Sequence, residues 1–215
     1  MVTDRPADPY PVELERDVET IGGGLVHLRP IRPTDDGHLT EFHERLSPQS
    51  VYRRFFFVHP RLTAAEIDRF THVDYRDRLA LIVEHGGQLI AVGRYERIAG
   101  TTEAEVAFVV DDRYQHQGIA TILLEELADS AWKHGIETFV AQTLIENRDM
   151  LDVFAGSGFP VSTTTEYGTV SVRFSIRNDE AYRSVRALRH PPVDGPARSE
   201  DRGPVRPAGG GAPVL

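Results

Sequence analysis

The chain has 215 residues, a formal net charge of −9 and no cysteine, which suits one domain with tails and excludes disulfide bonds, thiolate metal sites and a cysteine nucleophile. The negative charge argues against a general nucleic-acid binder and favours a basic protein or an amine as partner, although solubility alone also explains it. The sequence has no bilayer-spanning apolar run and no N-terminal secretion signal, so we expect a cytoplasmic protein without a membrane partner.

The first part of the chain is predicted to begin with a flexible segment. Residues 1–22 are acidic and proline-rich and lack sustained periodicity, so we expect a flexible lead-in there. An apolar run predicts a strand over residues 25–31. Three helices are expected next: an amphipathic helix over residues 35–46, and two helices with capping signals over 48–56 and 64–71.

The middle of the chain predicts a hairpin, a central strand and a long helix. The turn sequence His85-Gly86-Gly87 is typical of a hairpin. After Glu105 the third strand is apolar on both faces, which indicates a central position in a sheet. The long helix has one broad apolar face, and Gly135 fits the position just after its end. The expected elements are strands over residues 79–84, 89–97 and 103–111 and a helix over residues 118–134.

The last part of the chain alternates strand and helix before its composition changes. The expected elements are a strand over residues 138–143, a helix over 148–155, and an antiparallel pair over 161–165 and 169–176. From Arg177 onward proline, glycine and arginine dominate, which predicts a largely disordered tail over residues 178–215; a short helix near 179–188 is compatible with the sequence. Hairpins early and strand–helix alternation late predict an α/β fold with a mixed sheet.

An anion site is predicted where the central strand leads into the long helix. The strand Ala104-Glu105-Val106-Ala107-Phe108-Val109-Val110 is followed by Gln115-His116-Gln117-Gly118-Ile119-Ala120. The first N–H groups of a helix have no intrahelical partner, and the helix dipole adds to their attraction for anions. Gly118 lacks a Cβ, so a pyrophosphate can approach the backbone closely. With the carboxylate of Glu105 upstream, the pattern suggests group transfer from a cofactor with a phosphate tail.

The motif Gln115-x-x-Gly118-x-Ala120 resembles the acyl-CoA pyrophosphate signature of the GNAT superfamily of N-acyltransferases, and the resemblance extends from about Gly24 to Ile176. The chain is also similar to catalytic domains of bacterial protein lysine acetyltransferases of the Pat type. The segments that carry this similarity are Leu28-Arg29-Pro30-Ile31-Arg32-Pro33-Thr34-Asp35, Leu46-Ser47-Pro48-Gln49-Ser50, Arg54-Phe55-Phe56 and Ala104-Glu105-Val106-Ala107-Phe108. The resemblance implies a catalytic domain over residues 23–177 with a mostly antiparallel sheet, flanking helices and two splayed central parallel strands that form the acyl-CoA site.

The resemblance also assigns a set of cofactor-binding residues. It implies that backbone N–H groups bind the CoA pyrophosphate, that the strand edge bonds the pantetheine amides, and that one N–H near Val109 faces the thioester oxygen. The same residues also have explanations that need no ligand. Gly118 can simply open a helix, Phe108 and Val110 can pack in the core, His116 can be a surface histidine, and Asn147 can be an N-cap. The residues are Phe108, Val109, Val110, Gln115, His116, Gln117, Gly118, Ile119, Ala120, Thr121 and Asn147.

Glu105 is the candidate general base. An acceptor lysine arrives as an ammonium group that cannot attack, and a partly desolvated carboxylate with a raised pKa can take its proton. The alternatives are a structural ion pair with Arg94 or Arg97, or Glu103 as the base if the strand register is shifted. Many members of the superfamily carry a tyrosine that protonates the leaving thiolate, where this chain has Phe154; water can take that role.

These observations predict an acetyl-CoA-dependent N-acetyltransferase that acts on the ε-amine of lysine in proteins, by direct attack in a ternary complex. The alternatives are an N-acetyltransferase for a small amine such as an antibiotic or polyamine, and a non-catalytic acyl-CoA sensor. The first two differ in the acceptor cleft, which we expect within residues 35–72. The histidines lack metal-binding spacing and the chain has no nucleophile elbow, so we expect neither a metal nor a covalent enzyme intermediate.

Overall fold

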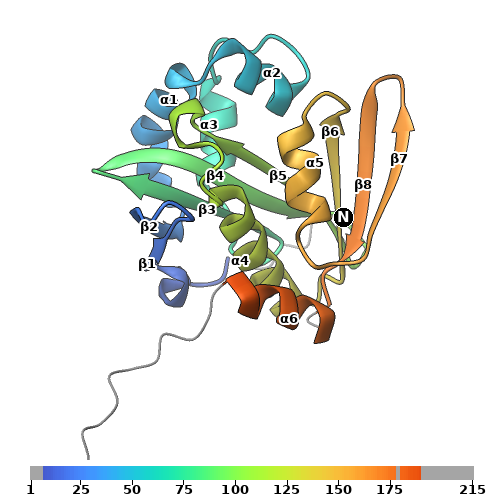
Figure 1. Cartoon of the computed structure of the whole chain (residues 1–215). Coiled ribbons are helices and arrows are strands. Elements are labelled where there is room, and N and C mark those ends of the chain that lie inside the picture. Colours follow the sequence, from blue (N-terminus) through green and yellow to red (C-terminus); the bar gives the residue numbers. More distant parts are fainter. Residues whose placement is uncertain (1–6, 178–179, 190–215) are drawn as a thin grey trace, which may run out of the picture.

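A computed structural model describes residues 7–177 and 180–189. Its eight strands form one sheet in the order β1-β2-β3-β4-β5-β6-β8-β7, flanked by helices (Figure 1). The strands are β1 Arg16–Glu19, β2 Leu25–Pro30, β3 Arg78–His85, β4 Gln88–Arg97, β5 Glu103–Val110, β6 Thr138–Leu144, β7 Val161–Glu166 and β8 Thr169–Ser175. The helices are α1 Asp36–Arg45, α2 Pro48–Phe55, α3 Ala64–Thr71, α4 Ile119–Lys133, α5 Arg148–Ala155 and α6 Glu180–Arg189.

The sheet separates two apolar cores. Alternating side chains of a strand point to opposite faces, so Leu81 of β3 packs in the core with α4 and its neighbour Ile82 packs in the core with α1. On the α4 side Leu123 and Leu127 are fully buried, and on the other side Phe42 of α1 is almost fully buried. The prediction of a mixed, mostly antiparallel sheet flanked by helices is confirmed.

The two central strands diverge. β5 and β6 are the one parallel pair among the described strands, and their register covers only Glu103 to Glu105 against Thr138 to Val140. Beyond that point β5 stays paired with β4 as far as Val110, and β6 stays paired with β8 as far as Leu144. The sheet therefore opens between them, as the predicted splay requires (Figure 1).

Local signals place the element ends within a few residues of prediction. The Ser47 hydroxyl accepts a hydrogen bond from the backbone N–H of Ser50 and begins α2. Thr63 and Glu66 form a reciprocal capping box at the start of α3. Gly135 has a φ of 76° after the end of α4, as expected for a residue that stops a helix in the left-handed conformation.

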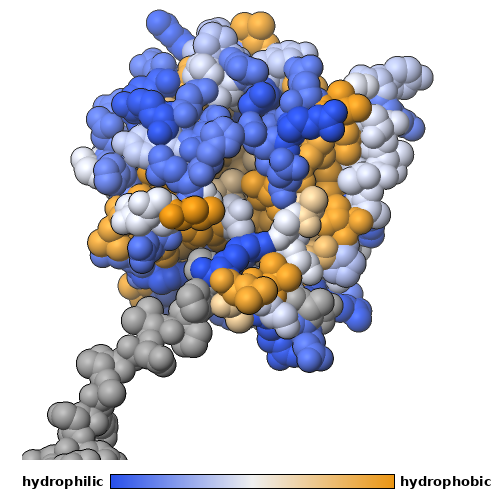
Figure 2. All heavy atoms as spheres, viewed as in Figure 1, coloured by the Kyte–Doolittle hydropathy of each residue, from blue (hydrophilic) through white to orange (hydrophobic). Residues whose placement is uncertain are grey.

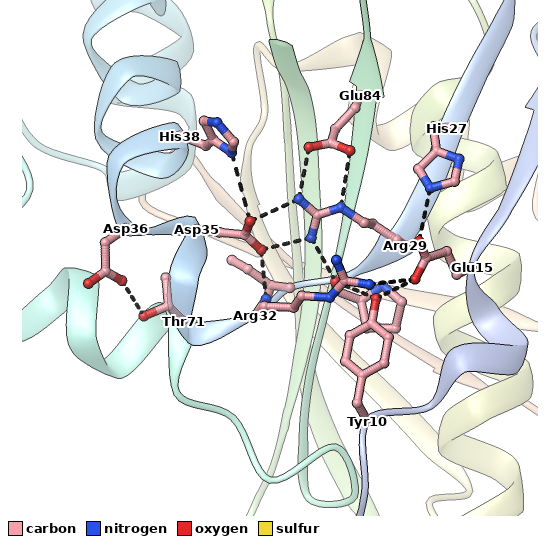
Figure 3. A network of polar contacts seen from close by, with 12 residues as sticks. Tyr10, Glu15, His27, Arg29, Arg32, Asp35, Asp36, His38, Thr71 and Glu84 are labelled. Atoms are coloured by element: carbon pink, nitrogen blue, oxygen red, sulfur yellow. Dashed lines mark hydrogen bonds and ion pairs between the residues drawn. The ribbon is translucent and has the colours of Figure 1, made fainter. Parts of the chain in front are cut away.

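The expected flexible lead-in over residues 1–22 is wrong for the described residues 7–22. A 3-10 turn at Val12–Leu14 and the edge strand β1 lie there, and β1 pairs antiparallel with β2. The acidic side chains that suggested flexibility are used in contacts. Glu15 accepts hydrogen bonds from Tyr10 at 2.9 Å and from Arg32 at 2.7 Å (Figure 3). A short edge strand of this composition has no periodicity of its own, so its partner strand decides its structure.

The same polar network ties β2 to the rest of the sheet. The guanidinium of Arg29 donates two hydrogen bonds of 2.8 Å to Asp35 and two further bonds, of 2.8 and 3.0 Å, to Glu84 (Figure 3). Asp35 also accepts from the backbone N–H of Arg32 at 2.7 Å. Burial opposes ionisation of Asp35, but the bonds from Arg29 and Arg32 outweigh it and lower the pKa of the carboxyl. The buried charges are therefore paired, as burial requires.

Within the expected tail over residues 178–215, residues 180–189 form the helix α6, close to the short helix that the sequence allows near 179–188. Tyr182 is almost fully buried and stacks on Phe159, with ring centroids 4.2 Å apart. Arg186 contacts Glu126 at 2.7 Å and also binds Asp129 of α4. The polar side of α4 thus becomes a packing surface once α6 supplies arginines. Residues 190–215 and 1–6 lie outside the described part of the chain.

Candidate active site

A cavity of about 410 Å³ opens at the point where β5 and β6 diverge. Its walls come from α2, the end of β5, the loop before α4, and α5. In Figure 2 hydrophobic side chains lie in the hollow in the middle of this face, with hydrophilic residues above it. The lining includes all the predicted cofactor-binding residues except Gln117: Phe108, Val109, Val110, Gln115, His116, Gly118, Ile119, Ala120, Thr121 and Asn147.

The loop before α4 has the properties of an anion cradle. None of the backbone N–H groups from Gln115 to Thr121 donates a hydrogen bond within the described residues. His116 and Gly118 have φ values of 61° and 79°, so the loop turns through the left-handed region at two places. The free N–H groups at the N-terminus of a 15-residue helix are those that bind phosphate in proteins. The residues present therefore fit the pyrophosphate of a CoA thioester.

Gln117 contributes through its backbone. Its carbonyl accepts a hydrogen bond from the N–H of Ile21 at 3.1 Å, which joins the N-terminal segment to the loop. The exposed side chain of Ile21 reaches the cavity wall. The sequence analysis missed this contact because it treated residues 1–22 as flexible.

A polar tether that the sequence analysis also missed holds α2 against the same loop. Asp112 accepts hydrogen bonds from the Ser47 N–H at 3.0 Å, the Ser47 hydroxyl at 2.7 Å and the Ser50 hydroxyl at 2.8 Å. The Gln115 side chain donates to the Ser50 hydroxyl and to the Val110 carbonyl. Burial raises the pKa of Asp112, but the bonds from Ser47 and Ser50 outweigh it, and the net shift is downward. The carboxylate therefore stays charged where it anchors α2.

The backbone direction of β5 makes the prediction of an N–H near Val109 more specific. The Asp111 N–H donates to the Ile90 carbonyl of the hairpin beside β5, and the Thr102 carbonyl accepts from Glu137 on the opposite side. Since N–H groups alternate along a strand with continuous register, the N–H of Val109 points to β4. The groups that face the opening toward β6 belong to Phe108 and Val110. Either can face a thioester oxygen, whereas Val109 cannot.

Glu105 stands at the last paired position of β5, and it is exposed. It lines a cavity of about 40 Å³ that also touches Phe108 and Asn147. Its carboxylate makes no hydrogen bond or ion pair with a described residue, so the predicted structural pairing with Arg94 or Arg97 is absent within residues 7–177 and 180–189. The expected partial burial of Glu105 is wrong, because the strands open at this point.

The competing carboxylate, Glu103, is engaged elsewhere. Arg173 of β8 binds it through both guanidinium nitrogens, one at 2.6 Å. This hydrogen bonding lowers the pKa of Glu103. A carboxylate held in such a pair is a poor proton acceptor, so the geometry favours Glu105.

Asn147 and Phe154 complete the wall on the α5 side. Asn147 precedes α5 without a side-chain capping bond, and its amide instead donates to the Thr143 hydroxyl at 3.2 Å. It lines both the large cavity and the cavity beside Glu105. Phe154 is buried against Phe108 and Phe174, which leaves no acidic proton at its position.

Charged side chains at the rim were not assigned by the sequence analysis. Arg53 of α2 contacts Asp149 of α5 at 3.5 Å, and His116 lies 3.8 Å from the same carboxylate. Arg54 lines the large cavity and also the cavity that contains Glu105. The Arg54-Phe55-Phe56 segment carries part of the family resemblance, so the sequence could have indicated a role for Arg54 at the site.

Within the described residues, no three histidine, aspartate or glutamate side chains are placed to hold a metal ion. No helix in the same part of the chain is long and apolar enough to cross a bilayer.

Comparison with known proteins agrees with the geometry of the site. Residues 39–159 match the model of the Acetyltransferase (GNAT) family. The chain belongs to the GNAT acetyltransferase family. It is 34% identical over 145 residues to Acetyltransferase Pat of Mycolicibacterium smegmatis, a match that covers 66% of this chain and 41% of that protein. It is 30% identical over 153 residues to Acetyltransferase PA5475 of Pseudomonas aeruginosa, covering 69% of this chain and 82% of the relative.

Among solved structures, the GNAT domain of S. lividans PAT is similar with a TM-score of 0.73 and 41% identity. The match covers 77% of this chain and 99% of that domain. The chain thus corresponds to a GNAT domain and spans less than half the length of the Mycolicibacterium Pat. GNAT acetyltransferases use acetyl-CoA as acyl donor, in keeping with the cradle described above.

Proposed function

We propose that this GNAT acetyltransferase transfers the acetyl group of acetyl-CoA to the ε-amine of lysine in a protein, by direct attack of the amine on the thioester in a ternary complex. One observation carries the proposal: where the strands diverge, Glu105 lines a small cavity that shares Arg54, Phe108 and Asn147 with the cofactor cavity. The similarity to Pat supports the lysine acceptor.

The free N–H groups from Gln115 to Thr121 would hold the pyrophosphate. The unpaired edge of β5 at Phe108 and Val110 would bond the pantetheine arm as an added strand, and Asn147 lies opposite with its side-chain carbonyl available as an acceptor. Acetyl-CoA supplies the activated thioester when bound.

The proton steps follow from the carboxylate and the phenyl ring. Glu105 takes a proton from the lysine ammonium, directly or through a water, which frees the nitrogen lone pair. The C–N bond then forms, the C–S bond breaks, and an N–H of Phe108 or Val110 stabilises the carbonyl oxygen during the step. The nitrogen, still positively charged after attack, releases its second proton to water, and water passes a proton to the departing thiolate, since Phe154 has no proton to give.

The size of the acceptor side supports a lysine from a protein surface over a small amine. Glu105 is open to solvent, and the cavity beside it measures about 40 Å³. A water needs about 10–15 Å³ of such space, so this cavity holds a few waters and does not enclose a whole antibiotic. A lysine side chain reaching in from a partner's surface needs no such enclosure.

The test compares lysine peptides and proteins with small amines as acceptors, following CoA thiol release. Glu105→Gln should lower kcat/KM by about 10²–10⁴-fold and leave acetyl-CoA affinity unchanged, because the carboxylate lies outside the large cavity. Glu103→Gln is the matched control, a carboxylate on the same face of the same strand, and should keep most activity.

Activity of Glu105→Gln equal to that of the wild type at pH 7 would remove Glu105 from the mechanism. Turnover confined to small amines would replace the protein acceptor by the alternative function.

A further inference from the structure

Two arginines on the acceptor side of the sheet form no ion pair with a described residue. Arg94 of β4 lies opposite Ala107 of β5, and Glu96 lies opposite Glu105, so Arg94 and Glu105 are diagonal neighbours on one face. Diagonal neighbours have Cα atoms roughly 7–8 Å apart. Arg54 of α2 lines the cavity beside Glu105 and also a separate cavity of about 30 Å³ that Arg94 lines. The two guanidinium groups therefore flank the position of the candidate base.

Neither guanidinium donates a hydrogen bond or forms an ion pair within the described residues. Each lies over an aromatic ring instead: the Cζ of Arg94 is 4.1 Å from the ring centroid of Phe70, and that of Arg54 is 5.2 Å from the ring centroid of Phe55. Two neighbouring arginines are paired, since Arg69 binds Glu96 at 2.8 Å and Arg78 lies 3.9 Å from the same carboxylate. A guanidinium has five N–H donors, so a large number of donors converge here without an acceptor.

The surroundings make this arrangement costly for the fold. The 30 Å³ cavity is otherwise lined mainly by apolar side chains of α1, α2 and α3 and of the sheet. Burial and the nearby cations Arg54, Arg78 and Arg69 lower the pKa of Arg94 to about 9. Burial also lowers the pKa of Arg54, against the attraction of Glu105. Burying unpaired cations destabilises a protein, which indicates that their purpose lies in binding.

The cavity has room for one small anionic group. Its volume of about 30 Å³ is the space of two or three waters, at about 10–15 Å³ each, enough for the head of a carboxylate and not for a whole small molecule. The nitrogen atoms of Arg54 and Arg94 are not among the fully buried, unpartnered polar atoms of the described residues, so a ligand can reach them. Paired guanidinium groups bind carboxylates strongly in such surroundings.

We propose that Arg54 and Arg94 form an anion subsite that selects acceptors with a carboxylate beside the reacting amine, which in a protein is an aspartate or glutamate next to the target lysine. This inference rests on the proposed function. Arg94 is the specific residue of the pair, because it does not line the cofactor cavity, whereas Arg54 does.

The experiment measures kcat/KM for matched acceptors that differ in one charge. Lysine peptides carry Asp or Asn on either side of the lysine, and 5-aminopentanoate is compared with pentylamine. The wild type should prefer the acidic member of a pair by roughly 10- to 100-fold. Arg94→Met should abolish the preference and leave the KM for acetyl-CoA unchanged. Arg61→Met, at an exposed arginine in the loop after α2, is the matched control and should keep the preference.

Thermal unfolding distinguishes a binding role of Arg94 from a structural one. If Arg94 stabilised the fold, its replacement would lower the Tm. Arg94→Met removes an unpaired, partly buried cation, so its Tm should equal or exceed that of the wild type. A Tm several degrees lower, or an equal loss of activity on both members of a pair, would overturn the subsite.

The outcomes separate the two proposals. Equal turnover of acidic and neutral lysine peptides refutes the subsite and leaves lysine acetylation standing. Turnover of 5-aminopentanoate over pentylamine, with no turnover of any peptide, refutes the protein acceptor and supports the subsite. If no acceptor is acetylated, both proposals fail.

Discussion

Helix α6 should contribute a large share of the stability of this domain, although its sequence resembles that of a tail. The perturbation is truncation: one variant ends at residue 177 and lacks α6, and the other ends at residue 189 and keeps it. The second removes only a segment rich in proline, glycine and charge, which should have little effect on stability.

The expected loss comes from two sets of contacts. Removing a buried aromatic side chain costs about 3–5 kcal/mol, and Tyr182 is almost fully buried with its ring stacked on Phe159. Glu125 is almost fully buried and binds Arg189. Truncation removes Arg189, and the loss of this partner from a buried carboxylate costs about 1–3 kcal/mol. We therefore expect a loss of about 4–8 kcal/mol in the free energy of unfolding, which lowers the Tm by roughly 10–30 °C in a chain of this size.

The assay is thermal unfolding of both truncations, with Tyr182→Ala and Tyr182→Phe in the full chain. Tyr182→Phe keeps the stacked ring and should unfold near the wild-type temperature, whereas Tyr182→Ala should show most of the loss. The packing of α6 would be refuted if the chain ending at residue 177 melted within about 2 °C of the chain ending at residue 189.

Two further predictions concern the cofactor loop and the buried ion network. Gly118→Ala should weaken CoA binding measured by calorimetry by roughly tenfold or more, because a left-handed φ costs about 1–2 kcal/mol for other residues and an added Cβ would lie 2.8 Å from Ile21. Gly100→Ala, with a φ of 76° and no neighbour within 4 Å, is the control and should leave CoA affinity unchanged. The lowered pKa of Asp35 in the folded protein means that its pairing with Arg29 contributes stability above about pH 4 and that this contribution is lost as the pH falls further through the folded pKa. Asp35→Asn should cost about 3–5 kcal/mol at pH 7 and flatten the acid limb of the Tm–pH curve; an unchanged acid limb would assign it to other carboxyl groups.

The sequence by itself determined the features that depend on neighbours within a few positions. The caps at Ser47 and Thr63, the end of α4 at Gly135 and the entrance to α4 at Gly118 use contacts inside one turn of the chain. The apolar periodicities of β5 and α4 likewise indicate which side chains become buried. Together they were sufficient to predict the mixed sheet and the order of helices and strands from β2 to β8, but not β1; the cofactor role of the loop before α4 stays a prediction.

Only the tertiary structure decided the contacts between distant segments. Asp112 meets Ser47 across 65 positions, and Arg29 meets Glu84 across 55. Strand register decides that the N–H groups of Phe108 and Val110, and not that of Val109, face the opening. The residues near Arg16 and Tyr182 become ordered because β2 and α4 supply partners that no local pattern encodes. Glu105 is open to solvent for the same reason, since exposure at a strand edge depends on where the neighbouring strand departs.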